Sequence, residues 1–184
     1  NNPGDLLGSK THIDRLFTIQ QKLDYLEEYG IDIVLLIDFS NEFSKISGRE
    51  FISILCSNFN LTYFIAGEGF KCGIRGDTSI DDIKGWFCPF GTIVESMPHV
   101  FHNGIRVSSS SIRELIKNGE MQAAGELLKK SYCLDLRNVP MVRKNNFCET
   151  GLAKINQLIP PKGRYLVQVD DGTSIGTVCP LEIH

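Results

Sequence analysis

The sequence predicts an α/β fold in which helices cover both sides of a parallel sheet, followed by a small C-terminal appendage that contains β-structure. Two observations carry this prediction: buried apolar runs alternate with helical patterns, and the pattern changes after residue 132. The strand-like runs cover residues 31–37, 61–66 and 91–97. The helical patterns cover residues 15–29, 47–55, 78–87, 109–118 and 120–130. Strands and helices that alternate at this spacing are typical of a parallel, doubly wound sheet.

The first predicted helix covers residues 15–29. Its apolar side chains, which repeat on one face, are Leu16, Ile19, Leu23 and Leu26. Gly30 ends the helix, and residues 31–37 follow as an apolar, β-branched run without alternation. Such a run is typical of a strand covered on both faces.

The middle of the chain repeats this order of strand and helix. Ser47 and Glu50 form a capping box that starts the next helix, and residues 61–66 follow as another buried strand. Residues 78–87 predict a short helix and residues 91–97 a third strand. In parallel sheets ligands bind at the carboxyl ends of the strands, so the loops after these strands are candidate sites.

The last 50 residues differ in character. Residues 135–162 contain three prolines and read as irregular, apart from a short helix around residues 153–158. Residues 164–169 predict a strand, residues 170–172 a tight turn and residues 173–178 the partner strand. We therefore expect a β-hairpin in this appendage.

Composition excludes several classes of protein. The net charge of −3 argues against a nucleic-acid binder, and the longest apolar run is far too short to span a membrane. The six cysteines stand singly, which argues against a zinc site and against a disulfide framework. Reduced thiols indicate a cytoplasmic protein, and no side chains are predicted to bind a metal.

A serine cluster at a predicted helix start is the most informative stretch of the chain. Residues 107–113 read V-S-S-S-S-I-R, and Ser111 with Glu114 forms a capping box. A helix N-terminus presents unpaired N–H groups to an anion, and the Arg113 guanidinium matches phosphate oxygens. The residues predict a phosphate site formed by Ser108, Ser109, Ser110 and Arg113. The alternative is an ordinary helix cap with a solvated arginine.

A glycine-rich loop follows the second predicted strand. Its glycines are Gly67, Gly69, Gly73 and Gly76. Glycine permits close approach of the backbone to a ligand, and Phe70 could offer a flat face to an aromatic ring. The alternative is a flexible surface loop.

The serine cluster resembles the V-S-S-T-x-I-R motif of the FMN adenylyltransferase module in bacterial bifunctional riboflavin kinase/FAD synthetases. Four further stretches agree with that family in order and spacing, and the resemblance covers residues 3–134. They are the helix start at 15–23, the aromatic segment at 39–51, the loop at 67–73 and the helix at 118–132.

The resemblance implies a fold of the nucleotidyltransferase (Rossmann-like) type over residues 1–134, with residues 135–184 as a short extension. It implies adenylyl transfer from ATP to FMN, giving FAD and pyrophosphate, with Mg²⁺ bound to the triphosphate. It assigns Ser108, Ser109, Ser110 and Arg113 to the ATP phosphates, with Arg113 as the catalytic residue. It places the flavin near Gly67, Phe70 and Gly73.

The chain also departs from the family pattern. The early G-x-F-D-x-x-H-x-G-H segment is absent from these residues, so we expect the first βαβ unit to lie upstream. Gly69 stands where the family has aspartate, and Cys72 where it has a second aromatic residue. The G-x-P-T-A-N motif of the riboflavin kinase barrel is also absent, and 50 residues are too few for that barrel, so we predict no kinase activity.

Two alternatives remain open at this stage. One is a relative that has lost catalysis and serves as a flavin- or nucleotide-binding module or as a scaffold. The other is a different small nucleotidyltransferase, such as a pantetheine-phosphate or cytidylyl enzyme. Those enzymes share the serine cluster but lack the loop at 67–73. The oligomeric state is not predicted.

Overall fold

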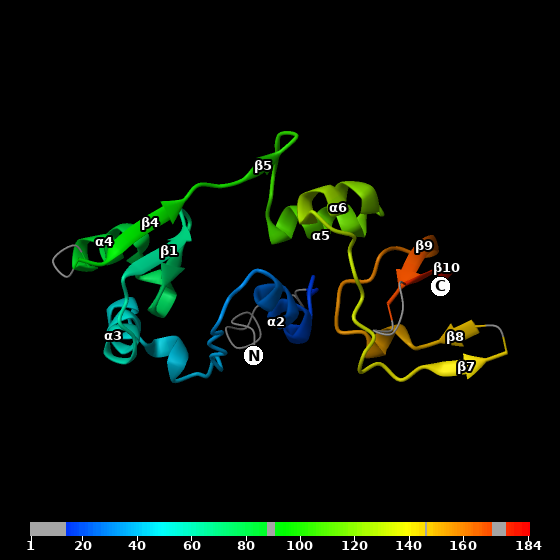
Figure 1. Ribbon diagram of the computed structural model, residues 1–184, viewed down its shortest axis with the longest axis horizontal. Helices are drawn as coiled ribbons and strands as arrows, with labels where there is room; N and C mark the ends of the chain where they lie inside the picture. The colour runs from blue at the N-terminus through cyan, green and yellow to red at the C-terminus, as the bar shows by residue number, and fades with distance from the viewer. Residues whose placement is uncertain (1–13, 88–90, 146, 171–175) are drawn as a thin grey trace. The chain divides into compact units, whose positions relative to one another are not determined.

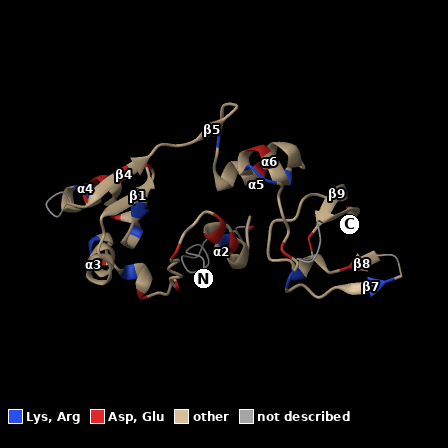
Figure 2. Cartoon of the chain, viewed as in Figure 1, with Lys and Arg blue, Asp and Glu red and all other residues tan. Residues whose placement is uncertain are grey.

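A computed structural model describes residues 14–87, 91–145, 147–170 and 176–184 (Figure 1). Within these ranges the chain forms two compact units. The first unit comprises residues 35–106, and the second unit comprises residues 14–34 together with 107–184. Lys and Arg positions are interspersed with Asp and Glu positions in both units (Figure 2). None of the described helices is long and apolar enough to cross a membrane.

The first unit is built around one parallel strand pair. Strand β1 (Tyr63–Gly67) pairs with β4 (Ile93–Met97) in parallel, with Tyr63 opposite Ile93 and Gly67 opposite Met97. Helices α3 (Gly48–Asn58) and α4 (Ile80–Phe87) share a core with β4. The buried side chains of this core are Ile52, Ile80, Ile83, Phe87 and Val94. Parallel strands joined through a helix confirm the α/β class, and the doubly wound sheet stays a prediction.

Short elements complete the first unit. They are the 3₁₀ turns η1 (Phe43–Lys45) and η2 (Ile74–Gly76), the antiparallel pair β2 (Lys71–Cys72) and β3 (Thr78–Ser79), and the antiparallel pair β5 (Phe101–His102) and β6 (Ile105–Arg106).

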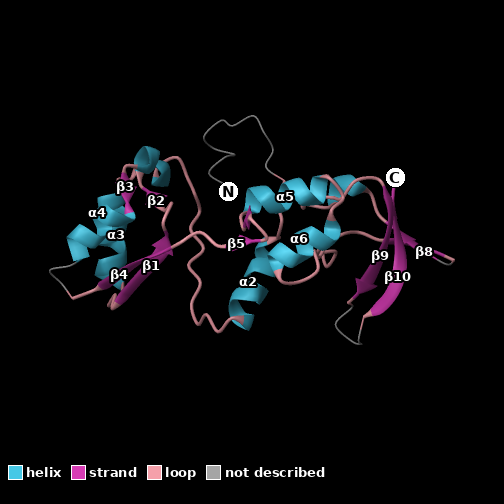
Figure 3. Ribbon diagram, turned by 90° about the horizontal axis from the view of Figure 1, so that it is seen from above, coloured by secondary structure: helices cyan, strands magenta, loops and turns pink. Residues whose placement is uncertain are grey.

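The described part of the second unit contains three α-helices and the C-terminal strands. The helices are α2 (Ile19–Glu28), α5 (Ser109–Lys117) and α6 (Met121–Leu128), with a 3₁₀ turn η4 (Leu152–Lys154) later in the chain. Strand β7 (Val142–Lys144) pairs with β8 (Phe147–Glu149), and β9 (Gly163–Val169) pairs with β10 (Thr177–Ile183); both pairs are antiparallel (Figure 3). The core is formed by Leu16, Ile112, Leu115, Ile116, Ala124, Leu127 and Leu158.

Most predicted elements are confirmed, with shifted ends. Ser47 caps α3 as predicted, and its hydroxyl accepts the Glu50 N–H at 3.2 Å. The predicted helix at 78–87 is α4 preceded by the short strand β3. The C-terminal hairpin is confirmed as β9–β10, and the predicted turn at residues 170–172 lies largely outside the described residues. The predicted short helix at 153–158 is only the 3₁₀ turn η4.

The prediction of a buried strand at residues 31–37 is wrong. This run has no secondary structure, and its side chains are exposed, with Leu36 at 68% and Ile33 at 71%. A strand is held by backbone hydrogen bonds to neighbours, and none of the described strands pairs with this run. The apolar run at 31–37 therefore predicted burial, but the described residues do not cover its side chains.

Two further predictions need smaller corrections. The predicted helix at 15–29 begins only at Ile19, because Thr18 caps α2 in a capping box with Gln21. Strand β1 is not buried on both faces, because Tyr63 and Ile65 are exposed at 56% and 57%. The apolar pattern located both elements, but it did not show which faces are covered.

Candidate functional site

The serine cluster forms the N-terminus of α5. Ser108 is the N-cap, with an extended backbone (φ −148°, ψ 156°). Its hydroxyl accepts the Ser111 N–H at 3.1 Å and lies 2.8 Å from the Ser111 hydroxyl. The predicted cap at Ser111 is therefore wrong by three residues. Residues 108–111 are all serine, so each of them could cap the helix, and the sequence pattern alone did not identify the capping residue.

This shift changes which donors face outward. The cap occupies the hydroxyl of Ser108, whereas Ser109 and Ser110 are exposed. Neither of these two residues makes a hydrogen bond through its N–H or hydroxyl to any residue that the structure describes. Because a helix N-terminus carries partial positive charge, this first turn can receive an anion.

Arg113 lies one turn further along α5 and is already fixed at one nitrogen. Its Nε donates to the backbone carbonyl of Asp14 at 2.8 Å. The guanidinium makes no other hydrogen bond to a residue that the structure describes, and its two terminal nitrogens carry further N–H donors. A guanidinium edge of this kind matches two phosphate oxygens at once. The structure thus brings Ser108, Ser109, Ser110 and Arg113 together at one helix end.

The glycine-rich loop lies in the first unit. Gly67 ends β1, and its carbonyl accepts the Phe70 N–H at 2.8 Å, which closes a tight turn. The Phe70 ring packs edge-on against Phe64, with centroids 6.0 Å apart, beside the core of this unit. The predicted stacking residue is therefore partly used in packing, and its contact with a flavin stays a prediction.

Gly73 has a structural reason to be glycine. Its backbone has φ +78° and ψ 179°, a conformation almost restricted to glycine. A Cβ atom there would collide with the backbone of Gly48 and with the Asp77 carboxylate. That carboxylate accepts the Gly48 N–H at 3.0 Å and so holds the start of α3. These contacts join the loop at Gly73 to the start of α3, and the choice between a ligand loop and a flexible surface loop stays open.

One contact between a histidine and a glutamate near this loop was missed by the sequence analysis. His99 Nε2 lies 3.1 Å from Glu68 Oε1, directly after the ends of β4 and β1. Gly69 adjoins it, since a Cβ at that position would lie 3.8 Å from His99 Cε1. The rule that ligands gather at the carboxyl ends of parallel strands could have pointed to Glu68, the residue after the strand.

A polar cluster in the second unit was also not foreseen. The Asp135 carboxylate accepts the Thr18 hydroxyl at 2.7 Å and the Arg137 guanidinium at 2.8 and 2.9 Å. The hydrogen bonds from Arg137 hold the pKa of the Asp135 carboxyl well below its usual range. Arg137 also reaches Asp24 at 2.8 Å. These contacts tie the segment after residue 134 to α2.

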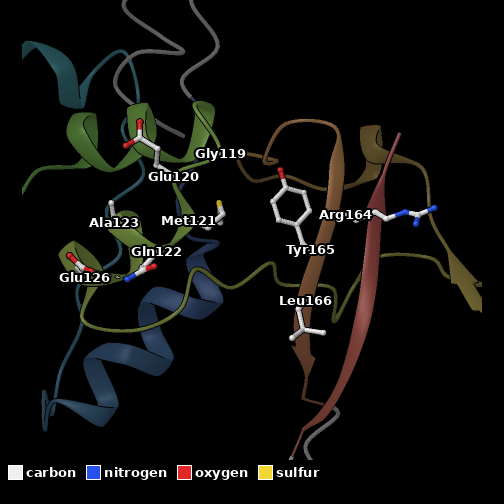
Figure 4. A pocket seen from close by; sticks show the side chains of 9 residues that line it. All are labelled: Gly119, Glu120, Met121, Gln122, Ala123, Glu126, Arg164, Tyr165 and Leu166. Atoms are coloured by element: carbon white, nitrogen blue, oxygen red, sulfur yellow. Dashed lines mark hydrogen bonds between the residues drawn. The ribbon is translucent and has the colours of Figure 1, made fainter.

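An open groove of about 610 Å³ lies between the start of α6 and β9 (Figure 4). It contains none of the predicted site residues. Its lining residues are Gly119, Glu120, Met121, Gln122, Ala123, Glu126, Arg164, Tyr165 and Leu166. Its charged lining residues, Glu120, Glu126 and Arg164, are of both signs.

Fold and site together define a mixed α/β protein with a parallel strand pair and an open, serine-rich helix N-terminus backed by arginine. The family profile described as FAD synthetase matches residues 1–111, more than half of the chain. The chain therefore belongs to the FAD synthetase family.

Several curated relatives align with most of the chain. A bifunctional riboflavin kinase/FMN adenylyltransferase of Buchnera aphidicola subsp. Schizaphis graminum is 31% identical over 138 residues, covering 73% of this chain and 44% of that relative. The enzyme of the same name from Escherichia coli K12 is 25% identical over 171 residues, covering 91% and 55%. An FAD synthetase of Listeria monocytogenes is 29% identical over 108 residues, covering 59% and 44%. The chain spans about half the length of these relatives.

A solved structure shares the fold. It is titled a macrolide-efflux protein from Streptococcus pneumoniae, with a TM-score of 0.72, 20% sequence identity, and coverage of 92% of this chain and 61% of that chain. At this identity the likeness concerns the fold alone.

Proposed function

We propose that the protein transfers the adenylyl group of ATP to FMN, giving FAD and pyrophosphate. Membership of the FAD synthetase family supports the reaction class. The observation that carries the site is Arg113, which is held through Nε beside the exposed first turn of α5. Both features suit the β- and γ-phosphates of ATP.

In this proposal the residues of α5 bind and orient the triphosphate. Ser109 and Ser110 donate N–H and O–H groups, Arg113 donates from its two terminal nitrogens, and Ser108 caps the helix so that these donors stay in place. An FMN phosphate oxygen attacks the α-phosphorus of ATP and forms the new P–O bond. The bond from that phosphorus to the bridging oxygen breaks, and the electron pair leaves with pyrophosphate.

In this reaction the protein has two main tasks: to align FMN with ATP and to stabilise the negative charge that develops. The FMN phosphate is already anionic near neutral pH, so no general base has to create the nucleophile. Negative charge builds on the departing pyrophosphate, where helix N–H groups and a guanidinium stabilise it. Phosphate oxygens are hard ligands of the kind that Mg²⁺ prefers, so we propose that Mg²⁺ is held by the triphosphate itself.

We place the flavin at the loop from Gly67 to Gly73, with Phe70 beside its ring system. The support for this part is the position of that loop after β1, at the carboxyl end of a parallel strand. We further propose a cytoplasmic location, in keeping with the free thiols of the described cysteines. These are Cys56, Cys72, Cys133, Cys148 and Cys179.

The test is FAD formation from FMN and ATP labelled at the α-phosphate, with Mg²⁺ present. We expect label in FAD and release of pyrophosphate. Arg113→Ala removes a charge-assisted contact of roughly 1.5–3 kcal/mol, so kcat/KM for ATP should fall at least about tenfold. An unchanged kcat/KM in this variant would reject the role of Arg113.

A second candidate is a nucleotide- or flavin-binding module without transfer. Gly69 in place of the family's aspartate and the packing of Phe70 on Phe64 favour it. The same assay separates the two, because a binding module would bind ATP or FMN and form no FAD.

A further inference from the structure

Residues 14–16, called the strap below, connect the C-terminal segment to Arg113. Each of the three backbone carbonyls in the strap accepts a hydrogen bond from a different donor. Arg113 Nε donates to the carbonyl of residue 14 at 2.8 Å, and the Leu158 N–H donates to that of residue 15 at 2.8 Å. Gln157 Nε2 lies 3.0 Å from the carbonyl of residue 16. The strap is therefore fixed on one side by residues 157–158 and holds the arginine on the other.

Gln157 anchors this arrangement from the interior. The residue is 6% exposed, and its Nε2 is also within hydrogen-bond distance of Gln21 Oε1 (2.9 Å) and the Cys133 carbonyl (3.1 Å). Its Oε1 accepts the Asp135 N–H at 2.7 Å. A buried amide that meets this many polar groups fixes the backbone around it, because each group left unpaired would be costly.

The strap contacts α5 a second time. The Asp14 carboxylate pairs with Lys117 Nζ at 2.9 Å, one helical turn beyond Arg113. Asp14 thus touches α5 through its carbonyl and through its side chain. The position of the Asp14 carbonyl relative to the helix is set at both points.

We propose that Gln157 and Asp14 are positioning residues that, through the strap, hold the Arg113 guanidinium in the orientation that receives the ATP phosphates. The inference rests on the proposed function, and it gives a role to a segment outside the family match at residues 1–111. An arginine that is held in place before phosphate binds loses less side-chain freedom on binding, and its planar guanidinium already has the orientation that binding requires.

The first experiment is a double-mutant cycle on ATP affinity, measured by equilibrium titration. Gln157→Met keeps the length of the side chain but can neither donate to the strap nor accept from Asp135. We expect about tenfold weaker ATP binding. Arg113→Lys should weaken binding by itself, and adding Gln157→Met to it should cause little further loss, because both changes act on one contact. Full additivity would overturn the proposal.

Thr150→Val is the matched control. The Thr150 hydroxyl donates to the Pro140 carbonyl at 2.8 Å, so this variant also removes one side-chain hydrogen bond to the backbone of the C-terminal segment, away from the strap. It should bind ATP as the unmodified protein does. Equal losses in Thr150→Val and Gln157→Met would contradict the proposal.

Asp14→Ala is a second variant that does not disturb the buried amide. Removing a carboxylate near a polyphosphate should strengthen binding if charge alone matters. Loosening the strap should instead weaken it, by about twofold to threefold. Unchanged or tighter ATP binding would overturn the positioning role of Asp14.

An NMR readout separates this inference from the proposed function. A hydrogen-bonded Arg113 Nε–H should exchange slowly with solvent, and Gln157→Met should speed that exchange even without ATP. Unchanged exchange would overturn the strap. If Arg113→Lys leaves ATP affinity unaltered while the exchange result holds, the proposed function fails and the strap does not.

Discussion

Replacing Asp135 by asparagine tests the polar cluster that joins the segment after residue 134 to α2. The carboxylate is 8% exposed and accepts hydrogen bonds from Thr18 and twice from the Arg137 guanidinium. Asparagine keeps the shape but loses the charge and one acceptor. Hydrogen bonds to a charged group contribute about 1.5–3 kcal/mol. Because the Arg137 side chain is 51% exposed, solvent weakens its share, and we expect a loss of about 1–2 kcal/mol.

The pH dependence has a defined sign. The pKa of Asp135 is lowered on folding, so its contribution to the free energy of unfolding is present above the unfolded pKa, about 3.9. It is lost progressively as pH falls below that value. The difference between Asp135→Asn and the unmodified protein should be full at pH 7 and should shrink below about pH 4.

Urea unfolding at several pH values between 7 and 3 measures this difference. Asp24→Asn is the control, because Asp24 also binds Arg137 at 2.8 Å but is exposed, so its substitution should have the smaller effect. A loss in Asp135→Asn that is equally large at pH 3 and pH 7 would refute the electrostatic explanation. So would an equal effect of the two substitutions.

Two further predictions concern glycine geometry and the exposed apolar run. Gly73→Ala should lower the free energy of unfolding by at least about 2 kcal/mol, because the strained backbone and the collision of the new Cβ both destabilise the fold. Gly30→Ala is the control: Gly30 also has a positive φ, but no atom lies near its Cβ position. It should lower the free energy of unfolding by only about 1 kcal/mol in the same urea titration. Leu36→Ser should change the free energy by less than about 0.5 kcal/mol, because the side chain is 68% exposed. A loss above about 2 kcal/mol for Leu36→Ser would instead indicate the buried strand that the sequence predicted.

Local signals in the sequence predicted the elements well. Capping by Ser47 and the apolar spacing in α5 and α6 depend on residues within a turn or two of each other, so they can be read along the chain. The run at 31–37 failed for the opposite reason. Whether it forms a strand depends on partners elsewhere, which an apolar run does not specify.

The candidate site was predictable in its residue types but not in its contacts. The serine cluster and Arg113 were identified from order and spacing, together with the family resemblance. The contact between Arg113 and the Asp14 carbonyl joins residues 99 positions apart. It uses a backbone atom that every residue has, so the identity of residue 14 does not predict it. For the same reason the sequence did not point to Gln157, although its side-chain amide contacts Leu16, Gln21, Cys133 and Asp135.

The central claim is that the first turn of α5 and Arg113 bind the polyphosphate part of ATP. Competitive titration with ATP, inorganic tripolyphosphate and adenosine tests it most directly, on the unmodified protein and on Arg113→Ala. The account predicts that ATP and tripolyphosphate each bind at least about tenfold more weakly to the variant, while adenosine binding stays the same. Equal tripolyphosphate affinity in the two proteins would contradict it.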